Sequence, residues 1–280
     1  MKPYLGAHVS AAGGHYRAIE KAKELGANTI QIFGASPRGW RASVPSSENI
    51  KKYKKALKDS DVKSVYLHGA YLVNLASEGE LYKKSIDNLS THLQIAVALG
   101  ADGLIFHIGA SKEKDIEKVH SRIAKGVKEV LGKVKGEAKL IMENSSGGGG
   151  KIGSTLEELA ALHKKLDFKR VAFCLDTAHV FEAGVLDFSP SGIKEFFDEW
   201  DSKIGIENLV ALHTNDSKTK FGSGSDRHEN LGEGEIGLSG FRSLAKEKRL
   251  ANTSWILEVP GFDNMGPDKR NLDILKSCFK

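Results

Sequence analysis

The stretch GLIFH at residues 103–107 is a short apolar run that ends on an ionisable residue. Runs of this kind are typical of strands that are buried on both faces of a parallel sheet. Seven further short apolar runs lie at residues 4–8, 29–33, 64–68, 139–143, 171–176, 209–213 and 254–258, and all of them except 29–33 also end on an ionisable residue. The sequence therefore predicts eight strands.

The spacing of these runs predicts how the strands are connected. Successive run ends are separated by 25, 35, 39, 36, 33, 37 and 45 residues, and each interval has room for a loop, a helix and a return loop. The segment 18–25 repeats its apolar residues at helical spacing and is followed by Gly26, a typical C-terminal cap. A later helix is predicted to begin at Ser154, with Glu157 as its capping-box partner. Strands and helices thus alternate along the chain.

Eight strand–helix units most economically close into a (β/α)8 TIM barrel, because closure removes both sheet edges. The fold class is α/β, and an open doubly wound sheet is the alternative. No linker or change in composition divides the chain, so residues 1–280 are expected to form one domain.

Composition and charge exclude several classes of protein. The 40% hydrophobic content argues against disorder, and the net charge of +5 permits a polyanionic partner without requiring one. The only two cysteines, Cys174 and Cys278, rule out a disulfide framework and a cysteine-based zinc finger. The first residues contain no continuous apolar region, and no stretch is apolar over a membrane-spanning length. We expect a soluble, cytoplasmic protein.

The candidate functional residues lie at the ends of the predicted strands. In a barrel of this kind the carboxyl ends of the strands surround the reactive face. Six consecutive runs end on residues that can bind metal ions, namely His68, His107, Glu143, Asp176, His213 and Glu258. So many ionisable groups at one mouth would repel one another or suffer desolvation, and divalent ions are the usual remedy. The pattern predicts a metal centre.

Three further candidate ligands, His179, Asp226 and His228, follow shortly after the strands. Nine ligands are too many for one ion, but they suit two or three ions if carboxylates bridge. Nitrogen and oxygen donors without cysteine favour catalytic zinc, and manganese or iron stays open.

The chain resembles the endonuclease IV family, the zinc-dependent apurinic/apyrimidinic endonucleases, over essentially its whole length. The motifs that carry the resemblance are GAHVSAAGG at 6–14, HGAYLVNL at 68–75, EN at 143–144, CLDTAH at 174–179, HTND at 213–216 and FGSGSDRHENLGEG at 221–234. The last of these is highly specific. The resemblance implies a TIM barrel with three Zn²⁺ ions that cleaves duplex DNA on the 5′ side of an abasic site, leaving a 3′-hydroxyl and a 5′-deoxyribose phosphate.

The resemblance also implies an assignment of the ligands. His68 and His107 would bind the first zinc, and Glu143 would bridge it to the second. Asp176, His213 and Glu258 would bind the second zinc, and His179, Asp226 and His228 the third. We assign Glu258 a further catalytic role, as the carboxylate that orients or deprotonates the attacking water.

Two loops beside the mouth are expected to contact DNA. They carry Arg38, Tyr71 and Leu72, which are residue types that wedge into a base stack from the minor groove. The resemblance places insertion residues at these positions. The structural alternative is that Tyr71 and Leu72 pack on the barrel rim and Arg38 is merely solvated. His8, at the end of the first run, is either hydrogen-bonded to a ligand carboxylate or structural.

Three positions depart from the family pattern. Ile108 stands where members commonly have proline, Gly39 replaces a polar residue, and Gly224 stands where an arginine often lies, which predicts the loss of one phosphate contact. None of these changes removes a predicted ligand.

Two other functions compete with the nuclease. A sugar isomerase or epimerase of the related barrel type would need one ion, held by Glu143, Asp176, His213 and Glu258, and leaves the other five candidate ligands unexplained. A non-catalytic binder of damaged DNA would require a broken ligand set. A single mouth that engages a bent duplex favours a monomer.

Overall fold

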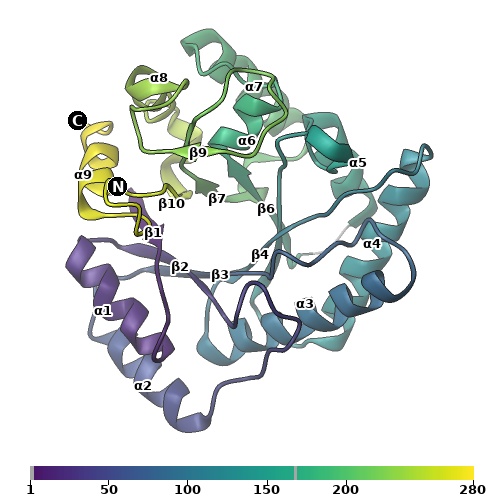
Figure 1. Cartoon of the computed structure of the whole chain (residues 1–280), viewed down its shortest axis with the longest axis vertical. Coiled ribbons are helices and arrows are strands. Elements are labelled where there is room, and N and C mark those ends of the chain that lie inside the picture. The colour runs from purple at the N-terminus through teal and green to yellow at the C-terminus, as the bar shows by residue number, and fades with distance from the viewer. Residues whose placement is uncertain (1–2, 167–168) are drawn as a thin grey trace.

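Eight parallel strands close into a barrel in the order β1-β10-β7-β6-β5-β4-β3-β2, with β2 returning to β1 (Figure 1). The computed structural model describes residues 3–166 and 169–280. The barrel strands are β1 (Tyr4–His8), β2 (Thr29–Phe33), β3 (Ser64–His68), β4 (Gly103–His107), β5 (Lys139–Glu143), β6 (Val171–Asp176), β7 (Leu209–His213) and β10 (Ser254–Leu257). The predicted TIM barrel is confirmed, and the open sheet is excluded.

Seven of the eight strands have the predicted bounds, and the last strand ends one residue earlier than predicted. β10 stops at Leu257, and Glu258 lies just beyond it. The backbone N–H of Glu258 donates to Oδ1 of Asn215 at 2.7 Å instead of continuing the sheet ladder. Glu258 nevertheless stays at the same end of the barrel as the other strand ends.

The helices form a ring around the barrel (Figure 1). They are α1 (His15–Leu25), α2 (Ser47–Lys58), α3 (Gly79–Leu99), α4 (Ile116–Lys133), α5 (Leu156–Leu166), α7 (Pro190–Lys203), α8 (Gly237–Leu244) and α9 (Lys269–Ser277). A short helix, α6 (Thr177–Glu182), follows β6 directly, and the 3-10 turns are η1 (Gly148–Gly150), η2 (Ile206–Asn208) and η3 (Lys248–Asn252). The predicted apolar face of α1 is buried, and Gly26 caps the helix in a left-handed conformation.

The predicted start of α5 is wrong by one residue. The hydroxyl of Thr155, not of Ser154, accepts the bond from the backbone N–H of Glu158, at 3.3 Å. The Glu158 carboxylate bonds back to the N–H groups of Gly153 and Ser154 at 3.0 and 2.9 Å. Glu158 therefore takes the role predicted for Glu157, because it lies three residues after the true cap.

The core has two layers. Inside the barrel lie Tyr66, Ile105, Ile141, Ala172, Cys174, Ala211 and Ile256. A larger apolar layer fills the space between the strands and the helix ring. Because the barrel interior is packed with side chains, the strand ends are held in fixed positions.

A long loop between β7 and α8, residues 214–236, is called the excursion below. It forms part of the mouth, the opening of the barrel at the carboxyl ends of the strands. It contains a two-stranded antiparallel pair, β8 (Asp216–Ser217) and β9 (His228–Glu229). The buried carboxylate of Asp216 accepts backbone N–H bonds from Gly232, Gly234 and Ile236 at 2.9–3.2 Å. Asp216 thus fixes the return of the excursion to the barrel.

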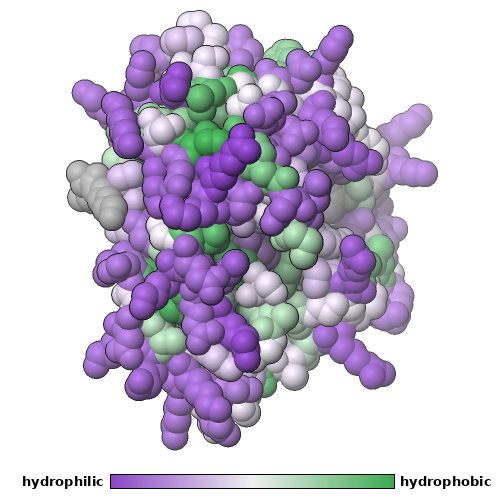
Figure 2. All heavy atoms as spheres, turned by 60° about the vertical axis from the view of Figure 1, so that its left-hand side comes forward, coloured by the Kyte–Doolittle hydropathy of each residue, from purple (hydrophilic) through white to green (hydrophobic). Residues whose placement is uncertain are grey.

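The side of the molecule that carries α1 and α9 shows mostly hydrophilic side chains with separate apolar patches (Figure 2). In the described part of the chain, no helix is both long and apolar enough to span a membrane.

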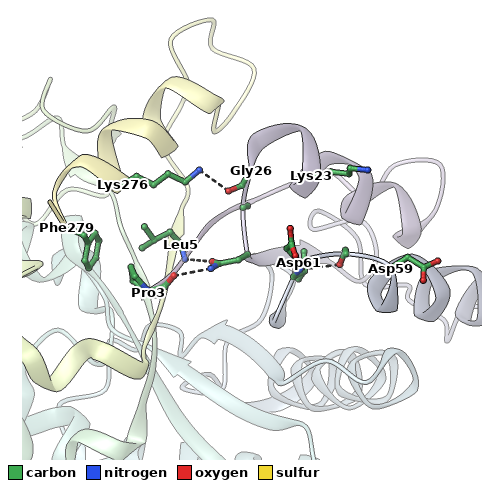
Figure 3. A pocket seen from close by; sticks show the side chains of 12 residues that line it. Pro3, Leu5, Lys23, Gly26, Asp59, Asp61, Lys276 and Phe279 are labelled. Carbon is green, nitrogen blue, oxygen red and sulfur yellow. Dashed lines mark hydrogen bonds between the residues drawn. The ribbon is translucent and has the colours of Figure 1, made fainter. Parts of the chain in front are cut away.

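A pocket of about 710 Å³ lies at the amino-terminal end of the strands (Figure 3). Asn28 bonds there to the backbone of Leu5 and Pro3, and Lys276 donates to the carbonyl of Gly26. Its described lining residues include none of the nine candidate ligands, which face the other end of the barrel. The candidate functional site therefore lies at the carboxyl ends of the strands.

Candidate metal centre

The carboxylate of Glu143 lies at the centre of the mouth. This residue ends β5 and is 1% exposed. Its Oε2 lies 3.2 Å from Nε2 of His68 and 3.4 Å from Nδ1 of His107, while its Oε1 lies 3.0 Å from Nδ1 of His213. The two oxygens of one carboxylate thus face two different sets of imidazoles.

Eight of the nine candidate ligands fall into three groups, and within each group the ligand atoms lie within 4.8 Å of one another. The groups are His68, His107 and Glu143; Glu143, Asp176, His213 and Glu258; and Asp176, His179 and His228. Glu143 belongs to the first two groups, and Asp176 belongs to the last two. Each group defines one candidate ion position, numbered first to third in the order given. Two carboxylates therefore connect three neighbouring positions. The sequence could not show this sharing for Asp176.

Asp226 completes the third position from outside these groups. Its Oδ1 lies 3.3 Å from Nε2 of His179 and 3.9 Å from Nε2 of His228. His179 stands in the first turn of α6, whereas Asp226 precedes β9 and His228 begins it. The helix turn and the excursion thus meet over the end of β6, and all nine predicted residues converge on one mouth.

Backbone carbonyls fix the orientation of two of the imidazoles. Nδ1 of His68 donates to the carbonyl of Gly69 at 2.8 Å, and Nδ1 of His179 donates to the carbonyl of Asn144 at 3.0 Å. Because each ring gives one nitrogen to a carbonyl, its Nε2 is directed into the mouth. This is the arrangement that metal-ligating histidines usually have.

The side chain of Gln31 orients a third imidazole. Its Oε1 accepts from Nε2 of His213 at 2.8 Å, which directs Nδ1 of His213 toward Glu143 and Glu258. The amide nitrogen of Gln31 donates to Oε1 of Glu258, and Nδ1 of His8 lies 2.9 Å from the same oxygen. His8 therefore contacts a candidate ligand carboxylate, which is the first of the two roles considered for it.

Burial and neighbouring charges act in opposite directions on these groups. Burial alone would raise the pKa of Glu143, but the imidazoles of His107 and His213 outweigh it and hold the pKa well below its ordinary value. The imidazole of His179, 3.3 Å from Oδ1 of Asp226, holds the pKa of Asp226 far below its ordinary value as well. Both carboxylates are therefore ionised at neutral pH, the form in which they bind metal ions.

The residues present fit a cluster of metal ions. Nε2 of His179 and Nε2 of His228 are buried in the mouth without a hydrogen-bond partner among the described residues. Buried polar nitrogens of this kind normally have a partner, and a metal ion would supply one. The donors are imidazole nitrogens and carboxylate oxygens, which suit zinc and other borderline metals.

Of the three predicted DNA-contact residues, Tyr71 and Leu72 line cavities at this mouth, and Arg38 lies in the neighbouring loop after β2. Tyr71 and Leu72 are 57% and 37% exposed in the loop after β3, and Arg38 is exposed in the loop after β2. The ring of Tyr71 lies 5.5 Å from that of Phe33 and 6.1 Å from that of His68, centroid to centroid. The backbone N–H of Tyr71 donates to the carbonyl of Pro37, so the two loops hold each other.

Sequence reasoning missed four residues of the site. Gln31 carries no sequence signal for a site, because a glutamine within an apolar run has the pattern of an ordinary strand residue. Asn144 and Asn215 each hold Asp176, through bonds of 2.6 Å to its backbone N–H and 2.7 Å to its Oδ2. Lys151 contacts Asp226 at 3.1 Å. A polar residue directly after a ligand was the available signal for Asn144, whereas nothing in the sequence links Lys151 to Asp226.

Comparisons with known proteins identify relatives of this chain. Residues 19–278 match a family described as xylose isomerase-like TIM barrel. The chain is 35% identical over 274 residues to the probable endonuclease 4 of Halothermothrix orenii, which covers 97% of this chain and 99% of that protein. The crystal structure of endonuclease IV from Thermus thermophilus superposes with a TM-score of 0.87 at 33% identity, covering 99% of this chain and 98% of the other.

More distant structures share only the fold. D-psicose 3-epimerase from Clostridium cellulolyticum superposes with a TM-score of 0.64 at 16% identity, covering 98% of this chain and 94% of that chain.

Proposed function

Because this chain belongs to the endonuclease IV family, we propose that it is a DNA-repair endonuclease that hydrolyses the phosphodiester 5′ to an abasic site with three zinc ions. The products are a 3′-hydroxyl and a 5′-deoxyribose phosphate. The substrate is duplex DNA, and the acting species is a monomer, because one mouth suffices for one lesion.

A single observation carries the proposal, namely the sharing of Glu143 and Asp176 among three groups of candidate ligands. A site for one ion needs only one such group. Three groups linked by two carboxylates support three ions: His68 and His107 at the first, His213 and Glu258 at the second, and His179, Asp226 and His228 at the third. Glu143 links the first and second positions, and Asp176 belongs to the second and also reaches the third.

The ions and the protein have different roles in the proposed reaction. Bound zinc ions lower the pKa of a water to about 7 and stabilise the charge that develops on the phosphate. The protein's own residues hold the ligands in position. Gln31, Asn144 and Asn215 keep the ligands in one orientation, and the packed barrel interior below them excludes bulk water.

The surroundings of Glu258 keep its carboxylate ionised and in a fixed orientation. Its Oε1 is held by His8 and Gln31, and its Oε2 lies 3.2 Å from Nδ1 of His213. The hydrogen bonds and charges of His213 and His8 outweigh burial and keep the pKa of Glu258 well below its ordinary value. We assign it the orientation or deprotonation of the attacking water, with Glu143 as the second catalytic carboxylate.

The loops around the mouth are the part of the protein that selects the lesion. An abasic nucleotide has already lost its stacking, so it leaves the helix more easily than an intact one. Tyr71 and Leu72 are exposed beside the mouth, where they can fill the gap in the stack, and Arg38 can contact the backbone.

Two measurements test the proposal together. Elemental analysis of the purified protein is expected to give about three zinc ions per chain, and the protein is expected to nick a duplex with one abasic analogue on its 5′ side. Addition of a chelator is expected to stop nicking. One ion per chain without nicking would support the sugar isomerase instead, because Glu143, Asp176, His213 and Glu258 alone can hold one ion.

A further inference from the structure

The loop between β5 and α5 places a lysine on the third group of candidate ligands. Nζ of Lys151 lies 3.1 Å from Oδ2 of Asp226 and 3.0 Å from Oγ of Ser146. The other oxygen of Asp226, Oδ1, faces Nε2 of His179. One carboxylate thus stands between an ammonium group and the imidazoles of the third position.

Glycines allow this loop to lie so close to the excursion. A Cβ on Gly148 would lie 2.2 Å from the carbonyl oxygen of Gly224, so only a glycine fits there. Gly149 and Gly150, which precede Lys151, both have a positive φ. The backbone of Ile152 then donates to the carbonyl of Gly109, which ties the loop to the end of β4. Lys151 is therefore held at the mouth by its backbone on both sides.

Lys151 lines a cavity that is also lined by Tyr71 and Leu72, two of the predicted DNA-contact residues. This cavity of about 400 Å³ is lined by Tyr71, Leu72, His107, Asp226 and Lys151, among others. Lys151 is the one lysine or arginine among its described lining residues. A phosphate that enters between the rim and the third position would meet this cation.

We propose that Lys151 is a phosphate-binding residue of the site, which exchanges its ion pair with Asp226 for a non-bridging oxygen of the DNA backbone when the substrate binds. The inference rests on the proposed function. The side chain of Lys151 is 35% exposed, so a phosphate can reach its ammonium group. The hydrogen bond to Ser146 can keep the ammonium group in place during the exchange. A lysine suits this role because its flexible stem lets a point charge turn from one anion to another.

The test measures how DNA binding depends on salt. Each lost phosphate contact is expected to reduce the slope of log K against log salt by about 0.9. Zinc-loaded Glu258→Gln protein serves as the parent, so that an abasic duplex stays intact during fluorescence anisotropy. Lys151→Met in this parent is expected to lower the slope by that amount. Lys151→Gln is expected to do the same, and replaces the Met variant if that protein does not fold.

Lys203→Met provides the matched control. It also removes one ammonium group from an ion pair, with Glu157 at 2.6 Å, but it lies on α7 in the outer ring. Its slope is expected to equal that of the parent.

The outcomes separate the two proposals. A parent that does not bind the abasic duplex, together with wild-type protein that does not nick it, overturns the proposed function. A parent that binds, with Lys151 variants of unchanged slope, overturns only the role of Lys151. Variants that lose zinc but keep the slope also overturn it, because Lys151 would then serve only to neutralise Asp226.

Discussion

Nε2 of His213 lies 2.8 Å from the side-chain oxygen of Gln31, and this bond decides which nitrogen of the imidazole faces the carboxylates. Gln31 is fully buried on β2, on the far side of His213 from Glu143. A single amide therefore orients one candidate ligand and, through its nitrogen, holds a second, Glu258.

Replacement of Gln31 by Leu is expected to weaken metal binding. The imidazole of His213 would lose the bond that fixes its tautomer, and loss of such outer partners typically lowers metal affinity about 10–100-fold. Competition with a chromogenic chelator measures the affinity. Gln31→Glu, which keeps an acceptor for His213, is the control for that bond. Unchanged affinity in the Leu variant would remove Gln31 from the site.

Replacement of Glu258 by Gln is expected to separate binding from cleavage. The amide keeps the shape of the carboxylate but cannot take a proton, so cleavage should fall by at least about 100-fold, the usual contribution of general base catalysis. Binding of an abasic duplex should change little. Single-turnover nicking and anisotropy measure the two quantities, with Glu199→Gln on the outer helix α7 as the control. An active Gln variant would end the catalytic assignment.

Truncation of Tyr71 to Ala is expected to weaken recognition of the lesion. Its exposed ring can stack in the duplex, and stacking of this kind contributes about 1–3 kcal/mol per base, or roughly 5–150-fold in affinity. Affinity for an undamaged duplex should change much less. Tyr71→Phe keeps the ring and should bind like wild type. Equal losses on both duplexes would instead favour packing on the rim.

Removal of the metal ions is expected to lower thermal stability. Four carboxylates, Glu143, Asp176, Asp226 and Glu258, gather at one mouth, and ions that bind only the folded state stabilise it. At free zinc a thousandfold above Kd, one site contributes about 4 kcal/mol. Differential scanning calorimetry with zinc and with EDTA measures the effect. The same Tm under both conditions would contradict a metal centre here.

His92 is expected to make the protein less stable in acid. It is fully buried in α3, and burial lowers its pKa to about 4. Between pH 6.5 and 4 the unfolded chain binds a proton that the folded protein does not, so stability falls as the pH falls, by about 3 kcal/mol in total. Urea unfolding across this range in EDTA measures the slope. His92→Leu should show a shallower slope than wild type, and an equal slope would contradict the assignment.

Much of the barrel could be predicted from sequence because its signals are local. A strand buried on both faces needs a short apolar run, and seven runs have the observed bounds. The two errors are at element ends. β10 stops before Glu258 because Asn215, 43 residues away, takes its N–H, and α5 begins after Thr155 because that hydroxyl, not the one before it, is placed to accept. Both depend on hydrogen bonds that spacing does not show.

The order of residues along the chain was enough to place nine imidazoles and carboxylates at or just after strand ends, because parallel strands of a barrel direct those ends to one mouth. How they share that mouth depends on the folded molecule. Asp176 reaches the third position because the excursion folds His228 back to within 3.5 Å of it, and Lys151 meets Asp226 across 75 residues of chain. Such pairings arise from the packing of loops against one another, a long-range property for which the residues themselves carry no local signal.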